Sequence, residues 1–161
     1  MPESADLSSL DYLALGEFRY QIRRFLHFSE EAARLDGLEP QQHQMLLAVR
    51  VLGETAEPTV GLLAEHLLLR PHSAVGLVDR LEERGLVERS RGTADRRQVY
   101  VRLTPAGQEK LRRLSLSHSQ ELRSSGPSLV EALRALLERS DSRTPAAPKE
   151  EDVSAVQERD S

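Results

Sequence analysis

The sequence predicts a mainly helical fold with one small β-hairpin and long helices near both ends. Apolar residues recur at helical spacing through most of the 161 residues. Two short β-prone segments interrupt that pattern, and a polar stretch with turn residues separates them. Charged residues make up 30% of the chain and aromatic residues only 4%, a composition that leans towards helices. The length suffices for one domain with a core and some tail.

The first third of the chain is expected to hold two helices. Residues 10–35 repeat apolar side chains at helical spacing, and Asp36-Gly37 supplies a C-terminal stop. The second helix starts at Pro40, a favoured first helical residue, and runs to Gly53. The first helix is long for a small domain.

Two shorter helices follow, with a brief break between them. Thr59 is a credible N-cap for a third helix through Leu67. Pro71 opens a fourth helix, which ends at Arg84-Gly85, where a cation in the last turn precedes a glycine stop. The apolar face of the fourth helix consists of Ala74, Leu77, Val78 and Leu81.

A β-hairpin is predicted after the fourth helix. Segments 86–89 and 99–103 are β-prone, and the polar stretch 90–97 joins them. From residue 84 to residue 102 there are six Arg against two acids, a local charge of +4, although the whole chain carries −4. A negative total does not exclude a nucleic-acid partner, because binding depends on where the cations lie.

The C-terminal part is expected to form two more helices and a tail. Thr104-Pro105 resembles the N-cap and first turn of a fifth helix, Gly126-Pro127 breaks it, and residues 129–137 form a short last helix. Residues 140–161 contain two Pro-Ala pairs and mixed charge, which predict a disordered tail.

Several protein classes are disfavoured by what the sequence lacks. There is no Cys, no apolar run of the roughly 18 residues that a membrane span needs, and no basic N-terminal segment typical of a signal peptide. We therefore expect a cytoplasmic protein that does not enter a membrane. No nucleotide-binding or hydrolase motif is present, and adjacent acids such as Glu82-Glu83 point to different sides of a helix, so no enzyme is expected.

The predicted order of elements is typical of proteins that bind duplex DNA. In a helix, turn and helix followed by a hairpin with a basic tip, the second helix fits the major groove, where base edges are distinguishable. The hairpin tip reaches the adjacent minor groove, whose negative potential favours arginine.

At this point the sequence resembles the MarR family of bacterial regulators. The ordered segments that carry the resemblance are Leu63-Ala64-Glu65, LVDRLEERGLVER at 77–89, Asp95-Arg96-Arg97 and VRLTPAG at 101–107. With the flanking long helices, the likeness extends over residues 7–138. It implies a winged helix-turn-helix reading head at about 40–103. It also implies dimerisation helices at about 7–36 and 104–138, and a homodimer that reads a pseudo-palindromic operator.

The resemblance also implies which residues contact DNA. In the family the wing holds an Asp that orients an Arg in the minor groove, and this pattern carries over to Asp95 and Arg97, with Arg96 as second choice. On the fourth helix, the predicted outward residues are His72, Ser73, Gly76 and Arg80.

Three residues near the turn depart from the usual family pattern. Gly76 stands where an Arg or Lys is common, and Arg70 stands where a Ser or Thr cap is common. We expect Arg70 to hold a phosphate; the alternative for Arg70 and Arg80 is an ion pair with Glu82 or Glu83. Leu68 replaces the usual turn glycine, so a positive φ at this position of the turn would carry a steric cost that glycine avoids.

Many members of the family bind small aromatic or phenolic acids between the dimer helices and the winged domain. Such a cleft could here be lined by Tyr12, Phe18, Tyr20, Arg24, His27 and His43. The alternative is that an aromatic stripe on a long helix belongs to the core. No cofactor or metal site is expected, because no Cys is present and the first four helices hold no His pair at i, i+4.

Taken together, the sequence predicts a homodimeric, sequence-specific regulator that binds double-stranded DNA and is usually repressive in this family. A possible small-molecule effector would release it. The alternative is a winged-helix module for protein–protein assembly that no longer binds DNA.

Overall fold

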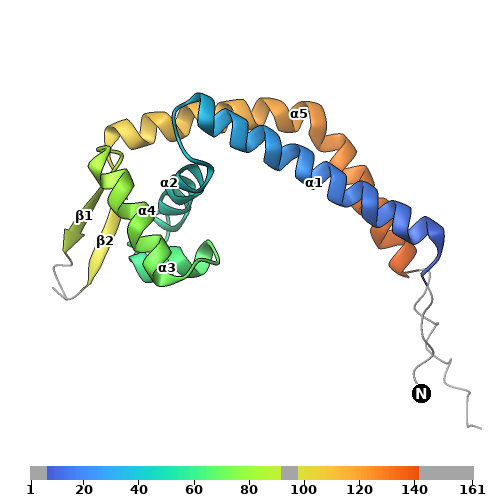
Figure 1. The fold of residues 1–161 in the computed structure, drawn as a ribbon, viewed down its shortest axis with the longest axis horizontal. Helices are drawn as coiled ribbons and strands as arrows, with labels where there is room; N and C mark the ends of the chain where they lie inside the picture. The colour runs from blue at the N-terminus through green and yellow to red at the C-terminus, as the bar shows by residue number, and fades with distance from the viewer. Residues whose placement is uncertain (1–6, 92–97, 142–161) are drawn as a thin grey trace, which may run out of the picture.

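The computed structural model describes residues 7–91 and 98–141, which form a compact body and a long two-helix arm (Figure 1). The arm consists of α1 (Ser9–Leu35) and α5 (Pro105–Asp141), which lie side by side. The body contains α2 (Pro40–Leu52), α3 (Val60–His66), α4 (Pro71–Glu83) and an antiparallel hairpin of β1 (Val87–Arg91) and β2 (Val99–Leu103). This is the mainly helical winged arrangement that the sequence predicts. None of the described helices is long and apolar enough to cross a bilayer.

The local signals that predicted the helix boundaries are present in the backbone. Gly37 follows α1 at φ 74°, a left-handed conformation that glycine adopts without a steric cost. Pro40 and Pro71 stand at the starts of α2 and α4, where the missing N–H removes no helical hydrogen bond. Thr59 caps α3, since its hydroxyl accepts a hydrogen bond from the N–H of Leu62 at 3.3 Å. These boundaries are confirmed.

The core joins the body to the inner end of the arm. Its fully buried large side chains include Met45 and Leu46 from α2, Leu63 from α3, Val78 and Leu81 from α4, and Val87 and Val101 from the hairpin. Leu111 and Leu114 of α5 belong to the same buried cluster. Burial of this common surface fixes α4 and the hairpin relative to the arm.

The predicted break at Gly126-Pro127 and the separate last helix are wrong. Instead, α5 continues through Pro127 to Asp141. Proline removes one helical hydrogen bond, but Pro127 is exposed, so the loss lies on the solvent side of the helix. Packing of α5 along α1 keeps the helix continuous. The predicted tail also starts too early, because Ser140 and Asp141 are still helical; the rest of it lies outside the described residues.

Leu68 adopts φ 54° in the turn between α3 and α4. This is the left-handed region, which costs an L-residue with a Cβ about 1–2 kcal/mol. Its side chain is 94% exposed, so packing of that side chain does not explain the conformation. The tight turn into α4 imposes the positive φ even though glycine, which would adopt it freely, is absent.

The N-terminus of α5 is joined to the turn that follows α4 by a close backbone approach. The Leu86 carbonyl accepts a hydrogen bond from the N–H of Thr104 at 3.1 Å, and the Thr104 hydroxyl donates to the Gly85 carbonyl at 2.6 Å. Gly107 lies against Leu86, the residue before β1. A Cβ on Gly107 would come within 1.9 Å of the Leu86 carbonyl oxygen. Only glycine fits there without backbone movement.

We predict that Gly107→Ala destabilises the fold by about 2 kcal/mol or more, since a methyl group would overlap a backbone carbonyl. Gly16→Ala in α1 is the matched control, because its Cβ would meet nothing within 4 Å and no proline follows it. This control should stabilise α1 by up to about 1 kcal/mol through helix propensity. Urea unfolding of both variants measures the difference, and equal stabilities would show that the close approach is not a constraint.

Candidate nucleic-acid interface

Helix α4 presents one buried face and one open face. Ala74, Leu77, Val78 and Leu81 are buried against the rest of the body. The opposite side is accessible along its length, with β1 beside it (Figure 1). A helix held in this way is free to enter a major groove, which has the width of one helix.

The predicted recognition residues lie on or beside this open face. His72 and Arg80 are exposed, and Ser73 and Gly76 are partly exposed. Arg80 also lines a shallow cleft of about 290 Å³ between α4, the end of α1 and the start of α2. Asp95, Arg96 and Arg97 lie outside the described residues.

Arg70 is the N-cap of α4 and leaves the first turn open to an anion. Its side chain is exposed and makes no capping hydrogen bond, and the first turn contains no acidic residue. The positive end of the helix dipole therefore meets an exposed guanidinium with no compensating charge from that turn. This arrangement suits a phosphate.

The alternative that Arg70 or Arg80 pairs with Glu82 or Glu83 is not what the described residues show. The carboxylate of Glu82 instead accepts the backbone N–H of Arg89 at 3.0 Å and forms an ion pair with its guanidinium. The other guanidinium nitrogen of Arg89 lies 2.5 Å from Asp79 Oδ1. Arg89 thus ties β1 to α4 through two acids one turn apart on the helix.

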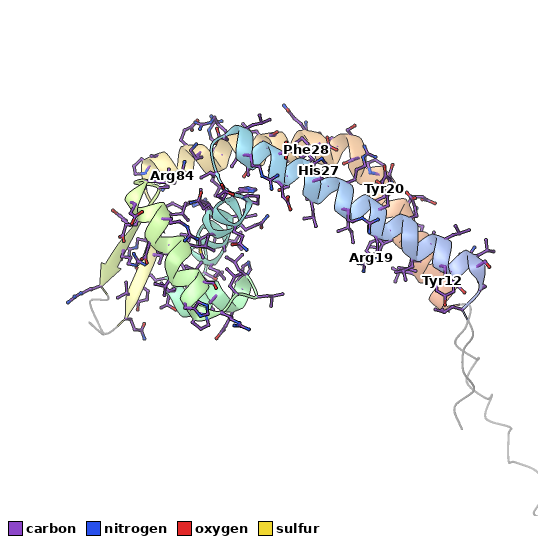
Figure 2. The ribbon with its side chains drawn as sticks, viewed as in Figure 1. Tyr12, Arg19, Tyr20, His27, Phe28 and Arg84 are labelled. Atoms are coloured by element: carbon purple, nitrogen blue, oxygen red, sulfur yellow. The ribbon has the colours of Figure 1, made fainter. Side chains whose placement is uncertain are left out.

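A second arginine ties the C-terminal end of α4 to the turn that joins the arm to the body. Arg84 donates to the Gly37 carbonyl at 2.7 Å and to Gln42 Oε1 at 2.9 Å, and so holds the turn between α1 and α2 (Figure 2). Arg102 on β2 pairs with Glu57. The arginines near α4 therefore divide into structural ones, such as Arg84 and Arg89, and exposed ones without a described partner, such as Arg70. This division was not predicted from the sequence, although two acids three residues apart on a helix, Asp79 and Glu82, just before a basic strand indicate it.

The predicted effector residues are not gathered into one cavity. Tyr12, Tyr20 and His27 follow one another along the exposed side of α1, with Tyr12 near the outer end of the arm (Figure 2). At 1.5 Å per residue, the distance from Tyr12 to His27 is roughly 22 Å. Arg24 is exposed as well, whereas His43 is buried on α2.

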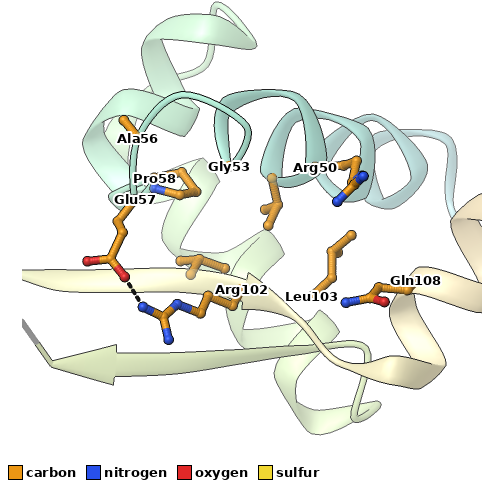
Figure 3. Close-up of a pocket in the computed structure, with 10 residues that line it drawn as sticks. Arg50, Gly53, Ala56, Glu57, Pro58, Arg102, Leu103 and Gln108 are labelled. Atoms are coloured by element: carbon orange, nitrogen blue, oxygen red, sulfur yellow. Dashed lines mark ion pairs between the residues drawn. The ribbon is translucent and has the colours of Figure 1, made fainter.

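Two cavities lie elsewhere in the described chain. One of about 380 Å³ opens at the base of the hairpin, between α2, β2 and the start of α5, and includes the Arg102–Glu57 pair (Figure 3). Its other cation, Arg50, pairs with Glu54 at 2.8 Å. The other cavity, of about 390 Å³, lies between α1 and α5 and is lined by Phe28, Glu31, Ala32, Leu35, Asp36, Arg113, Leu114 and Ser117. Neither includes a predicted effector residue.

His43 belongs to a buried cluster where the arm crosses the body. Its ring lies 4.9 Å from that of His118 on α5, and His118 Nε2 lies 2.7 Å from the Ser29 hydroxyl of α1. The rings of Phe25 and Phe28 are T-shaped to the His118 ring, with centroids 6.0 and 5.6 Å from it. Burial, and secondarily the nearby charge of His118, lower the pKa of His43 to about 4.

Comparison with known proteins agrees with this geometry. The MarR family model matches residues 36–98, which span α2, α3, α4 and β1. A protein named as a transcriptional regulatory protein for the hcr operon of Thauera aromatica is 28% identical over 162 residues, 92% of this chain and 96% of that protein. A probable transcriptional regulator from Pseudomonas aeruginosa has a crystal structure that is 30% identical, with a TM-score of 0.56 over 76% of this chain and 92% of that one.

Two further solved structures share the fold at lower identity. A mutant MarR from E. coli complexed with operator DNA is 23% identical, with a TM-score of 0.61 over 76% of this chain and 89% of that one. The second is the structure of BpsR from Bordetella bronchiseptica, whose DNA binding is regulated by 6-hydroxynicotinic acid. BpsR is also 23% identical to this chain. Its TM-score is 0.57 over 76% of this chain and 94% of that chain.

The His43 cluster predicts a pH dependence of stability. Because the folded-state pKa is about 4 and the ordinary value is 6.5, unfolding takes up a proton between these values. The stabilising contribution is complete above pH 6.5 and is lost as the pH falls towards 4. Over that window the unfolding free energy of the wild type should fall more steeply than that of His43→Phe, by up to about 1.4 kcal/mol per pH unit.

Chemical denaturation at a series of pH values measures this difference. His66→Phe, which removes an exposed imidazole from α3, is the control and should follow the wild type. Parallel pH profiles for wild type and His43→Phe would show that His43 is not kept neutral by its surroundings.

Proposed function

Since this chain belongs to the MarR family of DNA-binding, winged-helix transcriptional regulators, we propose that it is a homodimeric repressor of a pseudo-palindromic operator. The observation that supports DNA contact most directly is the open face of α4, with an exposed Arg70 at its N-terminus. Arg84 and Arg89 anchor the C-terminal half of that helix to the turn after α1 and to β1.

In the proposed complex α4 lies in the major groove and the hairpin tip in the adjacent minor groove. Arg70 contacts a phosphate, Ser73 and His72 reach base edges or phosphates, and Gly76 lets the helix come close. Arg80 contacts the DNA sugar-phosphate backbone from the side of α4 that is nearest the arm. At the wing, Asp95 orients Arg97 in the minor groove, with Arg96 beside it. The structure of E. coli MarR with operator DNA, which has the same fold, supports this docking.

The apolar surface of the arm supports a homodimer. Although α1 and α5 pack on each other, both helices still expose large apolar side chains. The exposed ones on the arm are Leu10, Tyr12, Leu13, Leu15, Tyr20, Leu26, Leu35, Leu116, Leu122, Val130, Leu133 and Leu137. This many exposed apolar side chains on a two-helix arm are more than a monomer normally leaves in water. A second copy related by a two-fold axis would cover it and would match two half-sites.

We further propose that a small aromatic anion modulates DNA binding at the dimer arm. The neighbouring structure of BpsR, whose DNA binding is regulated by 6-hydroxynicotinic acid, supports an effector of this class. Tyr12, Tyr20, Arg24 and His27 are exposed in one chain, so a partner subunit would be needed to close a pocket around them. His43 would act from the buried junction behind it.

We predict that Arg70→Ala weakens binding to a duplex selected from a random pool by about 1–2 kcal/mol, and to unrelated duplexes equally. Loss of one phosphate contact should also reduce the slope of log affinity against log salt by about one. Arg97→Ala should cost about 1–3 kcal/mol. Arg50→Ala is the control, because it removes an exposed arginine of α2 that is paired with Glu54 and is not proposed to contact DNA.

Fluorescence anisotropy at several salt concentrations measures affinity and slope together. An Arg70→Ala protein with unchanged affinity and slope would remove Arg70 from the interface. If no duplex were enriched by the wild type, the chain would be an assembly module and not a DNA-binding regulator.

For the dimer, we predict that Leu13→Glu converts a species of about 36 kDa, twice the 18.1 kDa chain, into the monomer. Leu13 is 68% exposed on the arm, so a charge there costs the isolated chain little but would be buried in the interface. Val51→Glu on α2 is the control and should remain dimeric. Sedimentation velocity at micromolar concentration distinguishes the species, and a wild-type monomer would refute the proposed assembly.

A further inference from the structure

Val75 is an apolar side chain on the open face of α4. It is 43% exposed and lies one turn after His72 and one turn before Asp79. The core-facing side of the helix is formed by other residues, so the fold does not require an apolar side chain here. Valine also has a lower helix propensity than the straight-chain residues that suit an exposed helix position.

The neighbours of Val75 leave it free to meet a base. Gly76 has no side chain, and a Cβ there would meet only Arg80 Nη1, at 3.5 Å. The helix backbone can therefore approach a groove floor closely, which the short valine side chain needs in order to reach it. Asp79, one turn after Val75 along α4, is held by Arg89 at 2.5 Å, which compensates its charge near phosphates.

The chemistry of the major groove leaves one matching partner. Valine can neither donate nor accept a hydrogen bond, whereas most groups on the base edges do one or the other. The apolar group in this groove is the 5-methyl of thymine. Packing valine against any other edge would remove water from a polar atom without replacing its hydrogen bond.

We propose that Val75 reads the 5-methyl group of a thymine and so fixes one T·A pair in each recognised half-site. This inference rests on the DNA-binding function proposed above. It adds a residue that determines specificity through van der Waals contact, next to the polar contacts of His72 and Ser73.

The test replaces thymine by uracil, which deletes only the 5-methyl group and keeps every hydrogen-bonding atom of the base. A duplex is first selected from a random pool by the wild-type protein, and each thymine in it is then changed singly. One position per half-site should show an affinity loss of about fourfold, the equivalent of about 0.8 kcal/mol for one buried methyl-sized group. Val75→Ala should bind the thymine and uracil duplexes equally well.

Val51→Ala is the matched control, since Val51 is 50% exposed on α2, on a helix that is not proposed to contact DNA. It should keep the wild-type preference for thymine. The inference on Val75 would be overturned, and the DNA-binding function would stand, in either of two cases. In the first, the wild type selects a duplex but no thymine-to-uracil change lowers its affinity. In the second, Val75→Ala shows the same affinity loss as the wild type. Failure to select any duplex would overturn the DNA-binding function and this inference with it.

Discussion

The division of α4 into a buried and an open face is the constraint on which the rest of this structure depends. Ala74, Leu77, Val78 and Leu81 must leave water, and α2, α3 and the hairpin supply the surface that covers them. Once that face is buried, the residues between them along the chain necessarily face outward. The open face is therefore a consequence of core packing, and its composition can vary without loss of the fold.

Electrostatic contacts then fix where that face points. Arg89 links α4 to β1, and Arg84 links its C-terminal end to the turn between the arm and the body. Both arginines lie at the protein surface, but each is held by two partners at once. Arg70 has no such partner among the described residues and remains available to a ligand. Sequence composition alone cannot separate these two roles, because the chain is rich in arginine throughout.

The junction between arm and body is where a signal from the arm would reach α4. Two contacts join α5 to the body. Near the start of α5, Gly107 lies against Leu86, and further along the helix the ring of His118 lies against that of His43. Both are tight, so a change in the relative position of arm and body would have to break packed contacts. A regulator that responds to an effector needs such a coupling between its dimer helices and its reading head.

The sequence by itself determined the elements and their order as far as the start of α5. Gly37, Pro40, Thr59 and Pro71 act on the backbone within one turn, so their effects could be predicted without knowledge of distant contacts. The outward residues of α4 followed equally from its 3.6-residue period.

Only the tertiary structure decided features that depend on distant partners. Packing against α1 carried α5 through Pro127, and the turn between α3 and α4 imposed a positive φ on Leu68. His43, predicted to line a ligand cleft, is buried against His118, a residue 75 positions away in the chain. Local propensities contribute about 1–3 kcal/mol at such positions, which burial of a shared surface can outweigh.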